Sequence, residues 1–399
     1  MQKHPSVLLN NAVEGSKALE TVQSFRGAFG LYVHVPFCSS ICPFCPYNKV
    51  RYAADEARDY FQSLKRELTA YASCLKGPFT TLYVGGGTPT LCLDELAETL
   101  EGIPIAGERA IEVLPLHATE HVLGRLRKMG FTYVSLGIQS FDDRVLKHLG
   151  RPHRAVHNHQ ALANAKGRFD CIDADLIFDL AFASPESFLW DFEECIRAGV
   201  DQTSTYPLMR FGYTPFGKGR HDRRSEHRVL AEATRIAADH GYERRSVWTF
   251  NRVGAPNYSS ITREFYLGVG AGAATYTGEG FTVNHFGLRQ YAAAINEGRL
   301  PIARRIALGP LRSATFYAFW QAYTGRIDLG RLLTSFPGAR PLVAAIRVAS
   351  RLGLVALVGD EARLTPRGYD AYHDLERWIT YAKIEPMWEQ GMREHQAAG

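Results

Sequence analysis

The sequence has no apolar run long enough to span a bilayer, and its N-terminal segment carries no hydrophobic core of signal-peptide length. It also has no repeat of fixed period and no low-complexity stretch. Lys and Arg alternate with Asp and Glu, so the formal net charge of +5 does not gather into a basic stripe that would bind nucleic acid. These absences predict a cytoplasmic globular protein that binds neither membrane nor nucleic acid.

Cysteine is scarce outside one short loop. The chain has seven cysteines, and three of them, Cys38, Cys42 and Cys45, lie within eight residues. The other four are scattered in apolar or helical surroundings, which predicts buried free thiols. An odd count with one tight group indicates a metal or redox site rather than a disulfide framework.

Three thiolates favour an iron–sulfur cluster over zinc. Soft thiolate ligands select iron–sulfur clusters, zinc or Cu(I). A structural zinc site needs four ligands, and the fourth would be His34, which lies in a strand that need not direct it toward the loop. Ordinary [4Fe–4S] clusters also take four thiolates, so three leave one iron open to a substrate. We therefore predict a cluster on Cys38, Cys42 and Cys45, with zinc as the alternative.

Between about residues 30 and 275, short apolar runs alternate with helical periods, which predicts an α/β fold with a parallel sheet. The expected strands are Leu31–Val35, Thr80–Val84, Ala110–Leu114, Tyr133–Leu136, Ile172–Phe178, Gln202–Tyr206 and Ser246–Phe250. The expected helices are Glu56–Leu75, Leu93–Leu100, Thr119–Lys128, Asp142–Leu149, Ser187–Ala198 and Glu226–His240. In such folds the functional site lies beyond the carboxyl ends of the strands.

Several residues that could hold a ligand follow that rule. A glycine-rich turn, Gly85–Pro89, follows the second strand, and Gln139 follows the fourth. The glycines allow close backbone approach, but their spacing matches no phosphate loop or dinucleotide fingerprint. Glu112 and Asp175 lie in apolar strands, where a carboxylate is costly without a partner. We expect both to meet a ligand, and a structural salt bridge is the alternative.

After about residue 300 the pattern changes. Two helical segments, Arg312–Thr324 and Arg340–Leu352, precede a hairpin with strands Val355–Val358 and Ala362–Thr365. Helices followed by a hairpin resemble a winged-helix module. We expect this region to cap a site or dock a partner rather than bind DNA.

Together these motifs resemble the radical S-adenosylmethionine (SAM) superfamily, whose signature is Cys-x3-Cys-x2-Cys. Within it, the sequence is similar to oxygen-independent coproporphyrinogen III oxidase and its relatives. The matching segments run in family order and are Tyr32–Cys38, Gly85–Thr90, Gly137–Phe141, Arg151, Asp175–Phe178 and Leu267–Ala273. The resemblance implies a partial (β/α)6 barrel over residues 30–300. An N-terminal extension over residues 1–29 would precede it, and a C-terminal helical, winged-helix-like domain over residues 301–399 would follow.

The resemblance also implies the cofactors. A [4Fe–4S] cluster on the three cysteines would chelate SAM through its open iron and cleave it to a 5′-deoxyadenosyl radical, with a second SAM alongside. By position, the contacts to the cluster-bound SAM are Tyr32, Gly86, Glu112 and Leu267. The contacts to the second SAM are Phe44, Gly87, Thr88, Gln139, Arg151, Asp175 and Met209. No catalytic residue is assigned beyond the cluster.

Departures from the family motifs argue against porphyrinogen decarboxylation. Asp179 and Ala181 stand where relatives typically carry Gly and Pro, and the Cys45–Lys49 segment differs from the glycine-cysteine sequel of the oxidase. We therefore predict a class C radical SAM methylase or cyclopropanase of natural product biosynthesis. It would transfer a methyl or methylene carbon to an sp2 carbon of a small aromatic or heteroaromatic substrate. Aromatic residues near strand ends suit such a substrate, although at least half should be core: Tyr206, Tyr213, Trp248, Phe250 and Tyr276.

Two alternatives on the same scaffold stay open. One is oxidative decarboxylation of coproporphyrinogen III or another anaerobic tetrapyrrole reaction, and the other is a haem-binding chaperone. The implied partners are a small-molecule substrate and an electron donor such as flavodoxin or ferredoxin. The methylase would add a partner methyltransferase.

Overall fold

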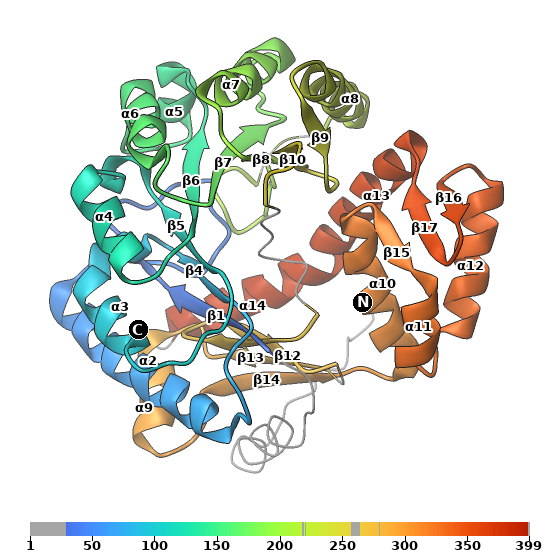
Figure 1. Ribbon diagram of the computed structural model, residues 1–399. Helices are drawn as coiled ribbons and strands as arrows, with labels where there is room; N and C mark the ends of the chain where they lie inside the picture. Colours follow the sequence, from blue (N-terminus) through green and yellow to red (C-terminus); the bar gives the residue numbers. More distant parts are fainter. Residues whose placement is uncertain (1–28, 218, 220, 257–263, 279, 398–399) are drawn as a thin grey trace.

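The computed structural model describes residues 29–217, 219, 221–256, 264–278 and 280–397. Within these ranges, six parallel strands stand side by side in sequence order and form the inner wall of an open barrel (Figure 1). They are β1 (Gly30–Val35), β4 (Leu82–Gly86), β5 (Arg109–Val113), β6 (Tyr133–Gln139), β7 (Cys171–Phe178) and β8 (Gln202–Pro207). The predicted α/β fold is confirmed. Apart from Phe29, the predicted N-terminal extension lies outside the described residues.

Helices cover the outer face of this wall (Figure 1). They are α2 (Ala54–Cys74), α3 (Leu93–Leu100), α4 (Glu120–Lys128), α5 (Asp143–His148), α6 (Ala155–Ala165), α7 (Pro185–Ala198) and α8 (Arg223–Asp239). The helix α6 has no counterpart among the predicted helices. Each helix buries an apolar stripe, for example Leu93, Leu96 and Leu100 of α3, against the sheet.

The alternation of side chains along each strand decides what faces the barrel interior. In β1, Leu31, Val33 and Val35 belong to the apolar core under the helices. The residues between them therefore point to the opposite, inner face. The same period places Glu112 of β5 and Asp175 of β7 on the inner face, because their strand neighbours lie in the core. The strands thus deliver polar side chains to one enclosed surface.

Shorter strands extend the wall at both ends. On the β1 side, β11 (Tyr266–Val269) pairs in parallel, and β12 (Ala274–Tyr276), β13 (Gly280–Asn284) and β14 (Ile302–Ala307) follow in antiparallel order, with α9 (Leu288–Asn296) between the last two. On the β8 side, β10 (Thr249–Arg252) and β9 (Tyr242–Arg244) close the sheet. The predicted strand Ser246–Phe250 was expected to continue the parallel sheet. It begins instead at Thr249 and runs antiparallel to β8, because the chain reverses in a hairpin between β9 and β10.

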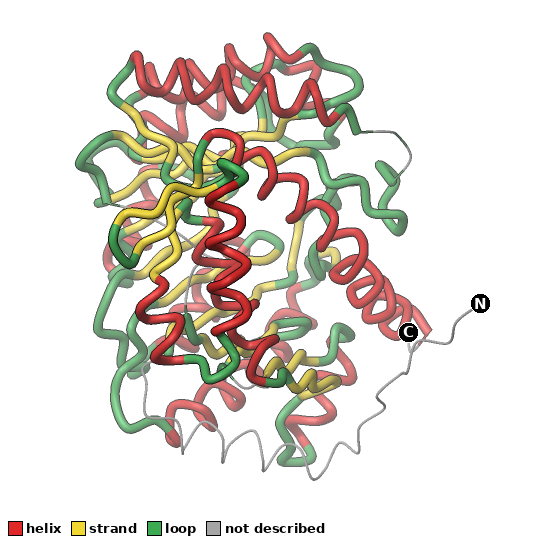
Figure 2. Tube along the Cα trace, turned by 90° about the vertical axis from the view of Figure 1, so that its right-hand side faces the viewer, coloured by secondary structure: helices red, strands yellow, loops and turns green. Residues whose placement is uncertain are grey.

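The C-terminal domain packs beside the open edge of the barrel (Figures 1 and 2). It contains α10 (Pro310–Tyr323), β15 (Arg326–Asp328), α11 (Leu329–Ser335), α12 (Arg340–Arg351), β16 (Val355–Val358), β17 (Glu361–Leu364) and α13 (Pro366–Ile379). The strands β16 and β17 form the predicted hairpin, and β15 adds a third antiparallel strand. None of the helices in the described ranges is both long and apolar enough to cross a membrane.

The chain then returns to the barrel. A π-helical turn over Thr380–Ile384 joins α13 to α14 (Glu385–Ala397), which runs back toward β1 (Figure 1). The Trp388 ring lies 5.6 Å from the ring of Tyr47 in the cysteine loop, measured between centroids. Arg304 of β14 donates a hydrogen bond to the carbonyl of Met387 at 2.9 Å. The last helix therefore covers part of the cysteine loop.

Candidate functional site

The cysteine loop, residues 38–49, leaves the barrel directly after β1. Its two ends are held together because β2 (Phe37–Cys38) pairs with β3 (Val50–Arg51). A tight turn inside the loop places the Cys45 amide 3.2 Å from the Cys42 carbonyl. All three cysteines are free of disulfides. The loop therefore presents three thiols on one short, anchored segment, as a bound [4Fe–4S] cluster requires.

Two cations lie beside these thiols. Arg151 donates from Nη1 to the Cys42 sulfur at 3.6 Å and from Nη2 to the Gly137 carbonyl at 2.9 Å. Lys49 donates to the Cys45 carbonyl at 2.6 Å. Burial raises the pKa of the Cys38 thiol to about 11, whereas the charge of Lys49 lowers it. Because metal ligation needs thiolates, these cations favour the ligating state. The residues present therefore fit the cluster.

His34 is not available as a fourth ligand for zinc. Its Nε2 lies 2.9 Å from the carbonyl oxygen of Asn48, which can only accept, so Nε2 carries the proton. Its Nδ1 accepts from the Tyr32 hydroxyl at 2.8 Å. Burial lowers the pKa of His34 to about 4, so the ring stays neutral in this arrangement. Both nitrogens are engaged, and the zinc alternative loses its fourth ligand.

The glycine-rich turn brings backbone close to both the cysteines and a carboxylate. Gly86 has a φ of +122° and donates its N–H to Glu112 Oε2 at 3.2 Å. A Cβ on Gly87 would lie 2.5 Å from the Phe37 carbonyl oxygen and 2.9 Å from the Cys38 sulfur. Neither position accepts a side chain without displacing the loop. The glycines are therefore required by the close packing of this turn against the rest of the protein, and the approach of their backbone to a ligand stays a prediction.

Glu112 is a carboxylate without an ion pair in the described ranges. Its Oε1 accepts a short hydrogen bond from the Tyr83 hydroxyl. Burial raises the pKa of Glu112 to about 7, an effect that the Tyr83 hydrogen bond opposes and that the charge of Asp175 strengthens. The alternative of a structural salt bridge therefore does not hold for this residue. Such a group is suited to meet a cationic ligand.

Asp175 and Asp173 lie two residues apart on the inner face of β7. Asp175 accepts from Ser135 Oγ at 2.6 Å, and burial raises its pKa to about 6 against that hydrogen bond and the charge of Arg151. Asp173 accepts from Ser204 Oγ at 2.8 Å, while its Oδ1 is buried without a hydrogen-bond partner in the described ranges. The sequence analysis missed Asp173, although its two-residue spacing from Asp175 on one strand places both on one face.

Three other predicted contacts lie around the same loop. Thr88 donates from Oγ1 to the Cys38 sulfur at 3.9 Å. Gln139 ends β6 with a φ of +67°, a strained conformation of the kind that gathers at functional sites. The Phe44 ring packs against the apolar group formed by Val145 and Ile177.

Of the remaining predicted contacts, some lie at the site and one is buried in the apolar core. Tyr32 lies on the inner face of β1, and its ring stacks on Tyr83 at 5.8 Å between centroids. Met209 accepts a weak hydrogen bond from the Tyr381 hydroxyl at 3.9 Å, so the C-terminal domain reaches this contact. Leu267 is fully buried in the apolar core, and its register partner Leu31 lies in the same core. The structure therefore does not bring the Leu267 side chain to the site.

The aromatic residues predicted near strand ends fall into two groups, those buried in the core and those partly exposed. Trp248, Phe250 and Tyr276 are buried in the core, as expected for at least half of the group. Tyr206 and Tyr213 are half-buried. The hydroxyl of Tyr213 donates to the carbonyl of Pro46 at 3.2 Å, which places this ring beside the cysteine loop. Of the five predicted rings, Tyr213 therefore offers accessible surface beside the cysteine loop.

A second group of buried charges joins the barrel to the C-terminal domain. We call it the charged clamp, and its members are Asp179, Arg210, His221, Glu226, His373 and Arg377. Glu226 of α8 accepts from His373 Nε2 at 2.6 Å and from Arg377 at a shorter distance, both on α13. Burial alone would raise the pKa of Glu226, but hydrogen bonds from His221 and His373 and the charge of Arg377 lower it. The clamp therefore holds Glu226 ionised.

The other half of the clamp anchors the π-helical turn. Asp179, just after β7, pairs with Arg210 and accepts from His221 Nδ1 at 2.9 Å. The other nitrogen of His221 lies 2.7 Å from the Tyr381 hydroxyl. That hydroxyl also accepts from the Arg210 amide at 2.9 Å. Two barrel loops are thus tied to the point where α13 becomes α14.

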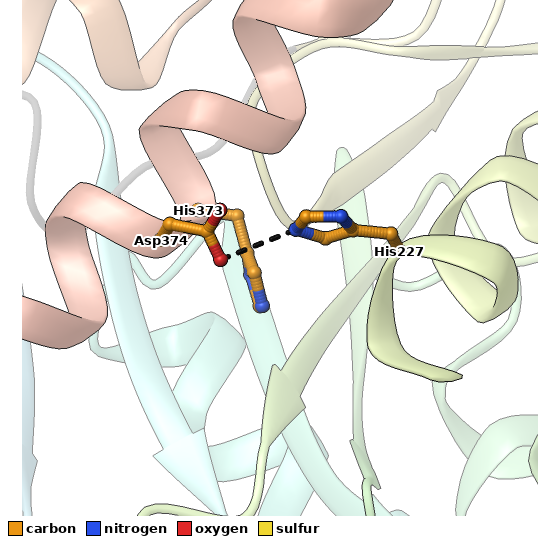
Figure 3. A group of neighbouring side chains, drawn as sticks. All are labelled: His227, His373 and Asp374. Atoms are coloured by element: carbon orange, nitrogen blue, oxygen red, sulfur yellow. Dashed lines mark hydrogen bonds and ion pairs between the residues drawn. The ribbon is translucent and has the colours of Figure 1, made fainter. Parts of the chain in front are cut away.

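Ligand types for a metal ion also meet at this junction, but their atoms are already used. Figure 3 shows His227 of α8 facing Asp374 of α13, with His373 beside them. Trp248 donates from Nε1 to His373 Nδ1 at 2.9 Å, and indole can only donate. Since Nε2 of His373 carries the proton toward Glu226, neither nitrogen is free for a metal. We therefore interpret this group as part of the interdomain contact.

Comparisons with known proteins now extend this geometry. A model of the radical SAM superfamily matches residues 32–197. The heme chaperone HemW of Lactococcus lactis is 29% identical over 266 residues, which are 61% of this chain and 69% of that protein. An oxygen-independent coproporphyrinogen III oxidase of Pseudomonas aeruginosa is 33% identical over 190 residues, which are 44% of this chain and 41% of that protein.

Among solved structures, coproporphyrinogen III oxidase (HemN) from Escherichia coli matches with a TM-score of 0.78 and 23% identity. The match covers 95% of this chain and 96% of that chain. It shows that the barrel and the C-terminal domain follow the same fold. The predicted partial barrel with a helical C-terminal part is therefore confirmed.

These relatives overturn one prediction. C-methylation or cyclopropanation was predicted, but the named relatives are HemW proteins and coproporphyrinogen III oxidases. The departures at Asp179 and Ala181 do not indicate a methylase, because Asp179 has a structural use in the charged clamp. The expectation of a partner methyltransferase depended on that reaction and has no support from these relatives.

The family match concerns the part of the chain that carries the cysteine loop and most of the parallel strands. A radical SAM domain implies a [4Fe–4S] cluster and SAM, and the free thiols of the cysteine loop fit that cluster. Residues 32–197 of this chain form a radical SAM domain, and the chain has homologues among the HemW proteins and the oxygen-independent coproporphyrinogen III oxidases.

Proposed function

We propose that this chain binds a tetrapyrrole, with haem as the first candidate, beside a [4Fe–4S] cluster and SAM. The observation that carries this proposal is that relatives of both kinds bear tetrapyrrole names. Haem comes first because the alignments with HemW of Lactococcus lactis and Bacillus subtilis cover 61% and 68% of this chain. The same relatives make a planar macrocyclic ligand the expected partner.

The inner face of the barrel supplies the SAM-binding groups in this proposal. Cys38, Cys42 and Cys45 hold the cluster, which when bound supplies the electron that cleaves SAM. Glu112 and the Gly86 backbone orient the cationic amino acid part of SAM, because an unpaired carboxylate gains most from a cation. A second SAM beside Arg151 and Asp175 remains part of the proposal, as does an external electron donor such as flavodoxin or ferredoxin.

The tetrapyrrole would lie between the cysteine loop and the C-terminal domain. Tyr47 supports this placement, because the residue is 54% exposed and its ring lies 5.6 Å from the Trp388 ring of the last helix. Tyr213 contacts the same loop through the Pro46 carbonyl. Aromatic rings gathered at one partly exposed loop suit a planar ligand.

Oxidation of a porphyrinogen is the second candidate. It is favoured by the 33% identity to the Pseudomonas aeruginosa oxidase, the higher of the two identities to named relatives given above. The altered sequence after Cys45 argues against it, because Pro46 and Tyr47 replace the glycine and cysteine associated with the oxidase. Haem binding therefore stands first.

The test is a titration of the reconstituted full-length protein under anaerobic conditions. Haem binding predicts a stoichiometric complex with a shifted absorption band, from which haem is recovered unchanged after incubation with SAM and dithionite. Porphyrinogen oxidation predicts release of carbon dioxide from coproporphyrinogen III together with 5′-deoxyadenosine. A protein that cleaves SAM yet binds neither haem nor coproporphyrinogen III contradicts both candidates.

A further inference from the structure

The chain turns sharply where β6 leaves the sheet. The Ser140 N–H donates to the Ile138 carbonyl at 2.9 Å, which closes a γ-turn around Gln139. The φ of +67° at Gln139 belongs to the rare, strained form of this turn, which residues with a side chain seldom adopt. The register between β6 and β7 also shifts between Leu136 and Gln139. A strained turn of this kind persists only where other contacts hold it.

Two buried side chains hold the turn from α6 and α7, which cover the outer face of the wall (Figure 1). Asp191 of α7 accepts from the Ser140 hydroxyl at 2.6 Å and from the Phe141 N–H at 2.7 Å. One carboxylate thus fixes both residues that follow the centre of the turn. Asn158 of α6 donates to the Ser140 carbonyl at 2.8 Å and to the first carbonyl of the turn at 3.3 Å. Asp191 is 3% exposed and Asn158 is fully buried.

The turn brings the Gln139 carboxamide back to Gly137. A Cβ on Gly137 would lie 3.2 Å from Gln139 Nε2 and 3.1 Å from Arg151 Nη2. The carboxamide and the guanidinium therefore share the space that this glycine leaves open. Arg151 in turn donates to the Cys42 sulfur. The Gln139 carboxamide thus lies beside the cation that contacts the cysteine loop.

The type of group at Asp191 suits the task of holding a strained turn. Both carboxylate oxygens are used by the turn, and Asp191 has no ion pair in the described ranges. Hydrogen bonds to an ionised acceptor are shorter and stronger than bonds between neutral groups. If these bonds are removed, the residue at the centre of the turn can return to a negative φ, and its side chain then points elsewhere.

We propose that Asp191 is a positioning residue: it holds the strained turn that keeps the Gln139 carboxamide beside Arg151, where the carboxamide meets SAM. This inference rests on the proposed function, because it takes SAM as the ligand. A carboxamide offers N–H donors, and next to a guanidinium these suit the carboxylate of SAM. Asn158 supports the same turn from the neighbouring helix. Neither Asp191 nor Asn158 touches the ligand itself.

The experiment measures the SAM affinity of the reconstituted full-length protein by equilibrium titration. Asp191→Ala should weaken SAM binding about 10-fold, the scale of a lost hydrogen bond to a charged group, and Gln139→Ala by a similar factor. The double variant should lose about 10-fold rather than about 100-fold, because Asp191 acts through Gln139. Glu193→Ala, which removes an exposed ion pair with Arg197 on α7, is the matched control and should bind SAM as the unaltered protein does.

A conservative variant and the strain of the turn add two readouts. Asp191→Asn keeps an acceptor for the Phe141 N–H and should weaken SAM binding less than about 3-fold. Glycine adopts a positive φ freely, so Gln139→Gly should raise the thermal midpoint of the full-length protein without SAM. In the Asp191→Ala background the turn is no longer held, and the same substitution should give no such rise.

The outcomes separate this inference from the proposed function. If the unaltered protein binds no SAM, the proposed function fails and this inference with it. If SAM binds and the double variant loses about 100-fold, or Asp191→Ala binds normally, the positioning role is wrong while the proposed function stands. An equal rise of the thermal midpoint in both backgrounds also contradicts it. If Asp191→Ala does not fold, Ser140→Ala, which removes one of the two hydrogen bonds to Asp191, takes its place in the same cycle.

Discussion

Carboxylates are buried at the barrel mouth, which holds Glu112 and Asp175, and at the junction with the C-terminal domain, which holds Glu226. Burial raises the pKa of the carboxylates at the mouth, whereas neighbouring cations keep the carboxylate at the junction ionised. At the mouth, burial raises the pKa of Glu112 to about 7 and of Asp175 to about 6, and Glu112 has no ion pair in the described ranges. At the junction, Arg377 and two histidines surround Glu226 and lower its pKa. Protein cations therefore compensate the charge of Glu226 at the junction without any ligand, whereas Glu112 at the mouth has no such cation in the described ranges.

The difference separates structural charge from functional charge. A buried carboxylate with matched partners stabilises one arrangement of two elements, and removing either partner leaves the other uncompensated. A buried carboxylate with only hydroxyl and amide partners stays partly protonated until a cation arrives. SAM carries an ammonium and a sulfonium, so its binding would complete the mouth as Arg377 completes the junction.

The largest expected effect breaks the mouth and spares the junction. Cys42→Ala should abolish both the brown colour of the anaerobically purified protein and SAM cleavage, because two thiolates do not retain a [4Fe–4S] cluster. Iron content near four per chain, the visible spectrum and 5′-deoxyadenosine formation measure this. The thermal midpoint should change little. Cys74→Ala, outside the loop, is the matched control, and full activity in Cys42→Ala would remove the cluster assignment.

The next effect breaks the junction and spares the mouth. Glu226→Ala leaves Arg377 buried without its carboxylate and should lower the free energy of unfolding by about 3–5 kcal/mol. Denaturant unfolding measures the loss, and SAM affinity of the folded fraction should persist. Arg235→Gln, which removes an exposed ion pair on the same helix, is the control and should leave stability unchanged. A comparable loss of stability in Arg235→Gln would show that the loss in Glu226→Ala is not specific to the charged clamp.

A neutral substitution at Glu112 should weaken SAM binding and at the same time raise the stability of the fold. Glu112→Gln should weaken SAM binding by about 1–3 kcal/mol, the scale of a charged hydrogen bond left unmade. The folded pKa of Glu112 is raised, so its cost to stability grows as pH rises from about 4.5 to about 7. Glu112→Gln should therefore be more stable than the unaltered protein at pH 8, by up to about 3 kcal/mol. Calorimetry and titration with SAM measure both, and normal SAM affinity would make Glu112 structural.

The smallest effect concerns acid pH and sharpens the same contrast. Because the folded pKa of Glu226 is lowered, its contribution to stability is present above its unfolded pKa of about 4.3 and is lost as pH falls below that value. Glu226→Gln should therefore lose less stability than the unaltered protein between about pH 4.5 and 3. Thermal midpoints across this range measure the difference. Equal loss in both proteins would mean that other carboxylates dominate acid unfolding.

The mouth could be predicted from the sequence because its parts are local. The cysteine spacing, the glycine-rich turn and isolated acids such as Glu112 in apolar strands are each visible within a few residues. The period of a strand then places them on one face. The same reasoning would have found Asp173, whose two-residue spacing from Asp175 gave the signal.

The junction could not be predicted, because its partners are distant in the sequence. Glu226 meets Arg377 only after two domains have packed, and no local pattern links α8 with α13. The reversal at β10 escaped prediction for a similar reason, since an apolar run does not encode strand direction. The choice of reaction failed because Asp179 was compared with family motifs without its partner Arg210.

The cover that α14 places on the cysteine loop has a consequence for assembly. Tyr47 and Trp388 meet although one precedes almost the whole barrel and the other follows it in the chain. During synthesis the cysteine loop therefore exists before the helix that shields it. Iron and sulfide can reach the three thiols while that side is open, and docking of α14 then covers part of the loop. We therefore expect the oxygen sensitivity of the loaded protein to increase when the contact between α14 and the loop is weakened.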